Sequence, residues 1–110
     1  MARVLVSESD PSVRSLLETV IARSGHDAVT VSGLREGELP EADLLVAEPA
    51  YGNGLRHARA LRERYESLPI VLVSILPPMR LFLSVAPAAY LMKPFSIAAL
   101  EQAVADALPG

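Results

Sequence analysis

Short hydrophobic runs alternate along the chain with segments in which hydrophobic residues recur at helical spacing. The runs cover residues 3–7, 28–31, 44–47, 70–74 and 89–92. Most of them are rich in leucine and β-branched residues, a pattern typical of strands that are buried on both faces of a parallel sheet. The alternation therefore predicts an α/β domain with five strands and helices between them.

The segment after the first run carries the clearest helical signals. Asp10 suits the N-cap position, and Pro11 suits the first position of the helix. Gly25 offers a C-terminal stop. Between these residues the hydrophobic positions recur at helical spacing: Val13, Leu16, Leu17, Val20 and Ile21. We therefore expect the first helix to follow the first strand directly.

A helix is also predicted after the third run, with a buried stripe at Leu55, Ala58, Leu61 and Tyr65. Three arginines, Arg56, Arg59 and Arg62, share another face of this helix. They could contact phosphate or an acidic partner. However, Glu63 and Glu66 are interleaved with them, which favours a solvated face.

The other connections are less regular. Only about a dozen residues separate the second and third runs, near the minimum for a parallel crossover that contains a helix, so we expect the second helix to be a remnant. Residues 79–85 are a short helix candidate between prolines, with an irregular coil or strand extension in the core as the alternative. Residues 96–108 form the last predicted helix, with Ser96 as its cap.

Composition indicates a single domain over residues 1–110, since 110 residues with 51% hydrophobic content suffice for one core. The chain has no cysteine, and His26 and His57 lie far apart, so no zinc motif is present. No apolar stretch is long enough to span a membrane, and the N-terminus lacks the layout of a signal peptide, so a soluble cytoplasmic protein is expected. The segment 108–110 could end a chain or begin a linker.

Polar side chains gather where the predicted strands end. Glu8, Ser9 and Asp10 follow the first strand, Glu48 the third, Ser74 the fourth, and Lys93 the fifth. The carboxyl ends of parallel strands meet at one edge of the sheet, where functional groups collect in such folds. The sequence therefore predicts a pocket with carboxylates, a hydroxyl and a lysine.

These segments resemble, in order and over nearly the whole chain, the receiver domain of bacterial two-component response regulators. The segment 3–11 is similar to the first strand and acidic loop of that family, and 42–48 to the phosphoacceptor strand. The segment 69–74 resembles the strand that ends in the switch serine or threonine. The segment 90–95 resembles the part that carries the switch aromatic (Tyr90), the lysine (Lys93) and a proline preceded by a cis bond (Pro94).

The resemblance implies a flavodoxin-like (CheY-like) doubly wound fold with a five-stranded parallel sheet in the order 2-1-3-4-5, here with reduced second and fourth helices. It also implies a chemistry in which an aspartate accepts a phosphoryl group from a histidine kinase. In that family an acidic pair and the aspartate hold Mg²⁺, and the lysine and the Ser/Thr contact the phosphoryl oxygens.

This chain departs from that pattern within the pocket. Glu48 stands at the phosphoacceptor position with its carboxylate one methylene further out, and Ser9 replaces a metal-binding acid with a neutral oxygen. Pro49 follows directly and removes a backbone donor. Asp10 could compensate as a metal ligand, although its sequence position favours the helix cap.

Simpler roles stay open for several of these residues. Lys93 could be a surface lysine, but it is the only lysine of the chain and precedes Pro94 and Phe95 at a strand end. Tyr90 could be a core residue, and Ser74 could merely cap a strand end. Glu8 and Glu48 could be solvated acids, but two acids facing one lysine favour a shared ion-pair network. We expect Glu48 to accept the ammonium group of Lys93.

The sequence thus favours an atypical receiver that is independent of phosphorylation, is not an enzyme, needs no cofactor or metal, and acts through protein contacts in signalling. The alternative is a receiver that still accepts phosphoryl or binds Mg²⁺ through Glu8, Asp10 and Glu48. A small-ligand binder on the same fold is a third possibility, less supported because no glycine-rich phosphate loop is present.

We also expect a homodimer through residues 79–92. Only Arg80 and Ser84 are polar in the segment 79–85, so an exposed apolar helix face is predicted there. The residues assigned to this interface are Met79, Leu81, Phe82, Leu83 and Val85. A net charge of −3 argues against direct nucleic-acid binding by the domain, and no membrane contact is expected.

Overall fold

A computed structural model describes residues 1–108, in which five parallel strands form one sheet in the order β2-β1-β3-β4-β5. The strands are β1 (Arg3–Ser7), β2 (Asp27–Thr30), β3 (Leu44–Ala47), β4 (Ile70–Ser74) and β5 (Ala89–Met92). The helices are α1 (Pro11–Arg23), α2 (Gly54–Arg64), α3 (Arg80–Leu83) and α4 (Ile97–Ala107), with a 3-10 turn, η1 (Glu36–Glu38). The predicted strand order is confirmed. The alternatives for the segment 108–110 concern mainly Pro109 and Gly110, which lie outside the described residues.

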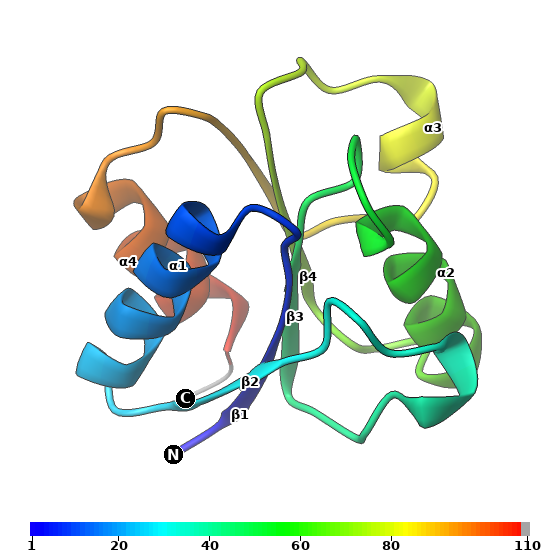
Figure 1. Ribbon diagram of the computed structural model, residues 1–110, viewed down its shortest axis with the longest axis horizontal. Helices are drawn as coiled ribbons and strands as arrows, with labels where there is room; N and C mark the ends of the chain where they lie inside the picture. The colour runs from blue at the N-terminus through cyan, green and yellow to red at the C-terminus, as the bar shows by residue number, and fades with distance from the viewer. Residues whose placement is uncertain (109–110) are drawn as a thin grey trace.

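The sheet stands between two layers of helices. Figure 1 shows α1 and α4 on one face and α2 and α3 on the other. Successive residues of a strand point to opposite faces, so each buried strand feeds two cores. Val4 and Val6 of β1 pack with α1 and α4, whereas Leu5 packs with α2. This double burial explains why the strands appear in the sequence as continuous hydrophobic runs.

Both predicted helix caps are present. The carboxylate of Asp10 accepts hydrogen bonds from the backbone N–H groups of Ser12 and Val13, with Pro11 at the first helical position. The hydroxyl of Ser96 accepts a hydrogen bond from Ala99 at the start of α4. These bonds satisfy amide groups that a helix start leaves without partners.

The crossover from β2 to β3 contains only η1, as its length predicted. The crossover has no α-helix of its own, and side chains of α2 bind it instead. The ring of His57 lies with Nε2 2.7 Å from the carbonyl oxygen of Leu34. Arg64 donates to the carbonyl of Leu39 at 3.3 Å, and Arg56 pairs with Glu36 at 2.8 Å. A crossover without a helix leaves carbonyl groups unpaired, and α2 supplies donors for two of them.

The arginine face of α2 is only partly solvated. Arg59 is exposed, as expected, but Arg62 is half-buried and bound to backbone carbonyls. Its guanidinium group donates to Val85 at 2.8 Å, to Ala86 at 3.2 Å and to Glu66 at 2.7 Å. The expectation of a solvated face is therefore wrong for Arg62, because the chain that leaves α3 turns back over this helix and presents its carbonyls there.

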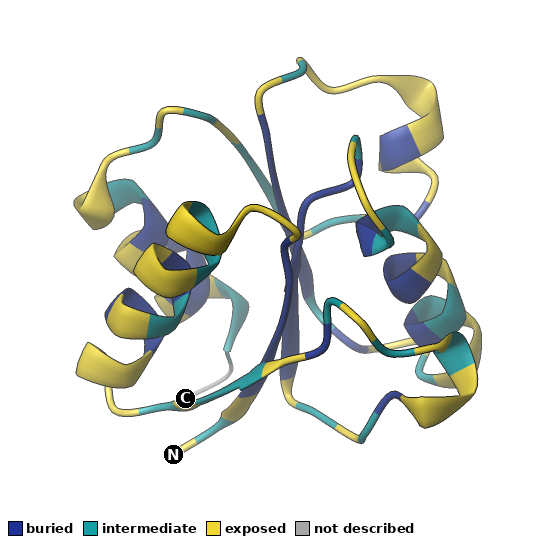
Figure 2. Ribbon diagram, viewed as in Figure 1, coloured by how far each residue is buried: buried dark blue, intermediate teal, exposed yellow. Residues whose placement is uncertain are grey.

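The short helix predicted within residues 79–85 is the single turn α3, and the structure divides the apolar residues of this segment into two groups. Phe82 and Val85 are buried in the core with exposures of 3% and 2%, so their assignment to an interface is wrong for the folded chain. A one-turn segment against a sheet must turn some of its apolar side chains inward. Figure 2 shows the rest of α3 as largely exposed.

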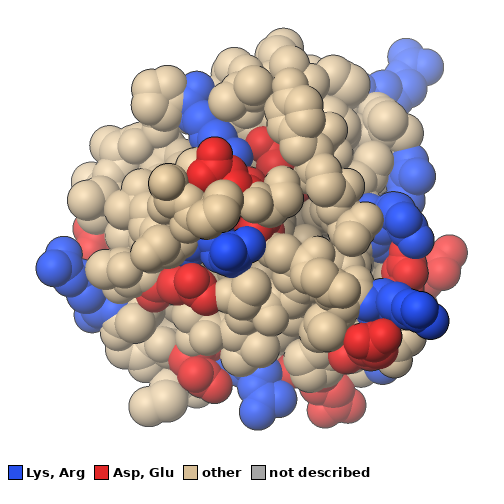
Figure 3. Space-filling model, in the orientation of Figure 1, with Lys and Arg blue, Asp and Glu red and all other residues tan. Residues whose placement is uncertain are grey.

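Charged side chains of both signs are mixed over the face shown in Figure 3, and no large patch of one sign lies on that face of the described residues. Among residues 1–108, no helix has both the length and the hydropathy needed to cross a membrane.

Candidate functional site

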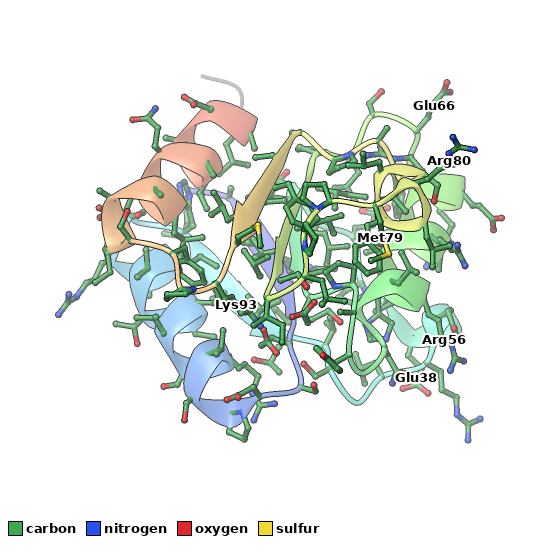
Figure 4. All side chains as sticks on the ribbon, turned by 90° about the horizontal axis from the view of Figure 1, so that it is seen from above. Glu38, Arg56, Glu66, Met79, Arg80 and Lys93 are labelled. Atoms are coloured by element: carbon green, nitrogen blue, oxygen red, sulfur yellow. The ribbon has the colours of Figure 1, made fainter. Side chains whose placement is uncertain are left out.

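Of the polar residues predicted to converge, Glu8, Glu48 and Lys93 are in contact at the carboxyl ends of β1, β3 and β5. Figure 4 looks down on this edge of the sheet and shows Lys93 near the middle of the molecule, whereas Arg56, Glu38 and Glu66 lie at the periphery. Lys93 follows β5 directly, and its side chain turns inward toward the strand ends. The only lysine of the chain is therefore not a surface lysine.

The ammonium group of Lys93 contacts two carboxylates. Its Nζ lies 2.6 Å from Oε1 of Glu8 and 3.0 Å from Oε1 of Glu48. The expected ion pair between Lys93 and Glu48 is thus present, and Glu8 forms the shorter of the two contacts. Both glutamates are almost completely buried, with 2% and 1% exposure. Buried carboxylates require such partners, since an unpaired buried charge is strongly destabilising.

The second oxygen of each glutamate is held by the backbone. Oε2 of Glu8 accepts a hydrogen bond of 3.0 Å from the N–H of Asp10. Oε2 of Glu48 accepts one of 2.8 Å from the N–H of Ala50. All four carboxylate oxygens are therefore engaged. The three side chains together carry one more negative than positive charge.

Lys93 is positively charged in this site. Burial lowers the pKa of Lys93, but the hydrogen bonds to Glu8 and Glu48 together outweigh burial and raise the pKa above its ordinary value of 10.5. The ammonium form is stabilised because both acceptors are carboxylates.

The loop after Glu48 packs tightly on the site. A β-carbon on Gly54 would overlap the backbone carbonyl of Glu48, so only glycine allows the start of α2 to approach so closely. Gly52 adopts a φ of +69° and lies against the side chain of Ser9. Gly54 is not among the predicted site residues, although a glycine at the start of a predicted helix is a signal of close backbone approach.

Two other supporting groups were also missed. Ser32 accepts a hydrogen bond of 2.8 Å from the N–H of Glu8, and its hydroxyl lies 2.6 Å from the carbonyl oxygen of Glu8. Ser7 Oγ lies 2.6 Å from Nδ1 of the buried His57. Ser32 follows β2, whose carboxyl end lies beside that of β1, so strand order was the signal available for it.

Ser74 and Tyr90 lie beside the charged cluster without a hydrogen bond to it. The hydroxyl of Ser74 is buried and accepts from the N–H of Leu76 at 3.1 Å. Tyr90 donates its hydroxyl proton to the carbonyl of Leu76 at 2.6 Å. Burial raises the pKa of Tyr90, and the negative charge of Glu48 adds to the increase. A switching role for the two residues stays a prediction.

The residues at the acidic pocket do not fit a magnesium ion. Ser9 is exposed and neutral, and the oxygens of Glu8 and Glu48 are bound to Lys93 and to backbone amides. Asp10 uses one carboxylate oxygen to cap α1, as its position favoured. Among residues 1–108, no group of three or more His, Cys, Asp or Glu side chains is arranged to hold a metal.

The peptide bond between Lys93 and Pro94 is cis, as predicted.

Known structures share this architecture. Chemotaxis protein CheY4 of Vibrio cholerae matches with a TM-score of 0.84 at 19% identity, over 98% of this chain and 99% of that one. The receiver domain of Francisella response regulator 1452 matches with a TM-score of 0.76 at 23% identity, over 97% of this chain and 96% of that one. The chain has the fold of response-regulator receiver domains.

The same fold also forms one part of a larger protein. NtrX from Brucella abortus matches with a TM-score of 0.81 at 18% identity, over 97% of this chain but only 27% of NtrX. No protein-family model matches the sequence, and a search of curated proteins finds no match. At these identities the likeness is one of fold, and the role of the pocket has to be argued from its own residues.

Proposed function

We propose that this chain is a receiver-like signalling module that acts through protein contacts, without phosphorylation and without enzymatic activity. The observation that carries the proposal is the contact of 3.0 Å between Nζ of Lys93 and Oε1 of Glu48. The receiver resemblance places a phosphoryl-binding lysine at this position. Here a carboxylate of the chain itself, that of Glu48, contacts the ammonium group of the lysine.

The contact favours one fixed state. A phosphoryl group carries a charge of about −1.5 to −2 near neutral pH, whereas Glu48 carries one negative charge, so the carboxylate imitates the modified state only in part. Glu8 supplies a second carboxylate to the same ammonium group. Two carboxylates of the chain therefore already neutralise the ammonium group of Lys93, without an added phosphoryl group.

Phosphoryl transfer to Glu48 is also geometrically unfavourable. Transfer depends mostly on positioning and on neutralisation of charge, and a displacement of the nucleophile by one bond length is costly. The carboxylate of Glu48 is buried and held by Lys93 and the N–H of Ala50. These two hydrogen bonds hold the carboxylate in one orientation and reduce its strength as a nucleophile.

The test is incubation of the intact domain with acetyl phosphate and Mg²⁺, followed by measurement of the intact mass. We expect no phosphoryl adduct on the wild type, while a phosphorylatable receiver domain treated in parallel gains one. A stable adduct that maps to Glu8, Asp10 or Glu48 would contradict the proposal and support a receiver that still accepts phosphoryl.

The proposal places partner contacts on the α3 surface, which we define as Met79, Leu81, Leu83 and Met92. These four side chains are between 38% and 49% exposed. Three of them lie within residues 79–83, and exposed apolar side chains that gather on a surface mark interaction sites. A second copy of the chain is the partner we propose, in line with the homodimer expected through residues 79–92. The domain itself is not expected to bind nucleic acid or a membrane.

A further inference from the structure

A second feature of the carboxyl edge is a cleft of about 500 Å³ that opens beside Lys93. Its walls are apolar side chains from α1 and from the loops after β3, β4 and β5: Val13, Leu16, Tyr51, Ile75, Pro94 and Phe95. Pockets that bind small molecules have volumes of roughly 300–1,000 Å³ and are lined mainly by apolar and aromatic residues. The cleft has that size and that lining.

Three of the wall residues are unusually exposed for their type. Leu16, Tyr51 and Ile75 are among the exposed large hydrophobic side chains of the chain, and all three border this one cleft. They come from three different elements, so their exposure is not explained by one poorly covered helix. Apolar side chains that gather around a concave opening remove little surface from water unless a ligand fills it.

The charged side chains that line the cleft determine which sign of ligand charge it favours. Glu8 and Glu48 contribute two negative charges, and Lys93 contributes one positive charge. Asp10 adds a further negative charge at the rim, where its side chain is exposed. Lys93 is the only cationic residue among the lining residues. The cleft is therefore net acidic, and low-dielectric walls concentrate that field.

We propose that this cleft binds a small organic cation, with one ammonium or amidinium group on an apolar or aromatic body. The charged group would lie near Asp10 and above the buried carboxylates, and the body would lie against Leu16, Tyr51 and Phe95. The inference does not rest on the proposed protein contacts, because no residue of α3 lines the cleft.

Other ligand classes fit the cleft less well. An anion would face the net negative charge of Glu8, Glu48, Asp10 and Lys93, and the only ammonium group is already held by two carboxylates. A bare metal ion would need carboxylate oxygens that are engaged in hydrogen bonds. A ligand that is both cationic and apolar uses the field and the walls together.

The test is a titration of the isotope-labelled domain followed by amide NMR shifts, with three probes that share a phenyl body. These are 2-phenylethylammonium, 2-phenylethanol and 3-phenylpropanoate. We expect saturable shifts at cleft residues with the ammonium probe, weaker binding of the alcohol, and no binding of the carboxylate. Equal binding of all three probes, or saturation outside the cleft, would overturn the proposal.

Two variants test the residues. Asp10→Asn keeps a good helix cap but removes the rim charge, and we expect it to weaken binding of the ammonium probe about two- to fivefold. Asp106→Asn makes the same change on α4, outside the cleft, and should leave the affinity unchanged. Tyr51→Ala should weaken binding of the ammonium probe and of the alcohol alike. Unchanged affinity in both Asp10→Asn and Tyr51→Ala would also overturn the proposal.

Discussion

The first residue of α2, Gly54, packs so closely against Glu48 that a single added carbon would overlap the carbonyl oxygen of that residue. The helix start is therefore in backbone contact with Glu48, and this contact restricts the loop between them. Pro49, which is buried in the same loop, restricts the backbone further.

Gly54→Ala should destabilise the domain by about 1–3 kcal/mol, the usual cost of overpacking, since the obstacle is backbone and cannot rotate away. The free energy of unfolding in urea measures this effect. Gly37→Ala is the matched control, because a β-carbon there would meet no atom within 4 Å. It should change stability by less than about 0.5 kcal/mol. Equal effects of the two variants would show that the close approach is not a real constraint.

Lys93→Met keeps a long side chain but removes the positive charge. Glu8 and Glu48 would then be buried without a counter-charge, and we expect a loss of about 3–5 kcal/mol at neutral pH. Chemical unfolding at neutral pH gives the measurement. A stable variant at neutral pH would mean that the two carboxylates do not depend on Lys93.

Alkaline conditions provide a separate test of the same group. Because the folded-state pKa of Lys93 is raised above 10.5, its contribution to stability is complete below that pH and is lost as the pH rises through the raised value. The wild type should therefore lose part of its advantage over Lys93→Met above about pH 10.5. Tyrosine ionisation affects both proteins, so the difference between them isolates the lysine. A stability difference between the two proteins that stays constant up to the highest pH measured would contradict the raised pKa of Lys93.

The α3 surface predicts self-association. Leu81→Glu places a charge on an exposed apolar position and should convert a dimer into folded monomer in sedimentation experiments. Leu16→Glu is the matched control, since Leu16 is exposed on α1, outside that surface. Phe82→Glu should unfold the protein, because Phe82 is buried in the core. A wild type that stays monomeric at high concentration would rule out the dimer.

Ala86 adopts a φ of +53°, a conformation that suits glycine better than alanine. The left-handed region costs a residue with a β-carbon about 1–2 kcal/mol, and the greater freedom of glycine in the unfolded chain offsets about 0.5–1 kcal/mol of this. Ala86→Gly should thus stabilise the domain slightly in thermal unfolding. Ala88→Gly, two residues further along the same segment, should destabilise it instead. A loss of stability in Ala86→Gly would show that the strain is relieved elsewhere.

The strand pattern made most of the fold predictable. Four strands have the predicted bounds, and β2 begins and ends one residue early, since Asp27 already pairs with Arg3. Continuous hydrophobic runs settle such strands because both faces are buried. The strand order came from the family resemblance, since periodicity carries no information about which strands are neighbours. The short helices followed from connection lengths.

The charged members of the site were predictable, but its supporting groups and its detail were not predicted. The order of acids and lysine at strand ends placed Glu8, Glu48 and Lys93 together, and they are in contact. Burial of Phe82 and the carbonyl contacts of Arg62 could not be predicted, because they depend on where one turn of helix settles against the sheet. Periodicity over four residues cannot decide which side faces inward.

Helix α2 has a mechanical consequence that reaches beyond its own packing. Through His57 it holds the crossover that lacks a helix, through Arg62 it holds the chain leaving α3, and through Gly54 it abuts the backbone of Glu48. Three irregular segments thus share one rigid support. The residue that holds the chain leaving α3 and the residue that touches Glu48 thus belong to the same helix, so contacts run without interruption from α3 to the charged pocket.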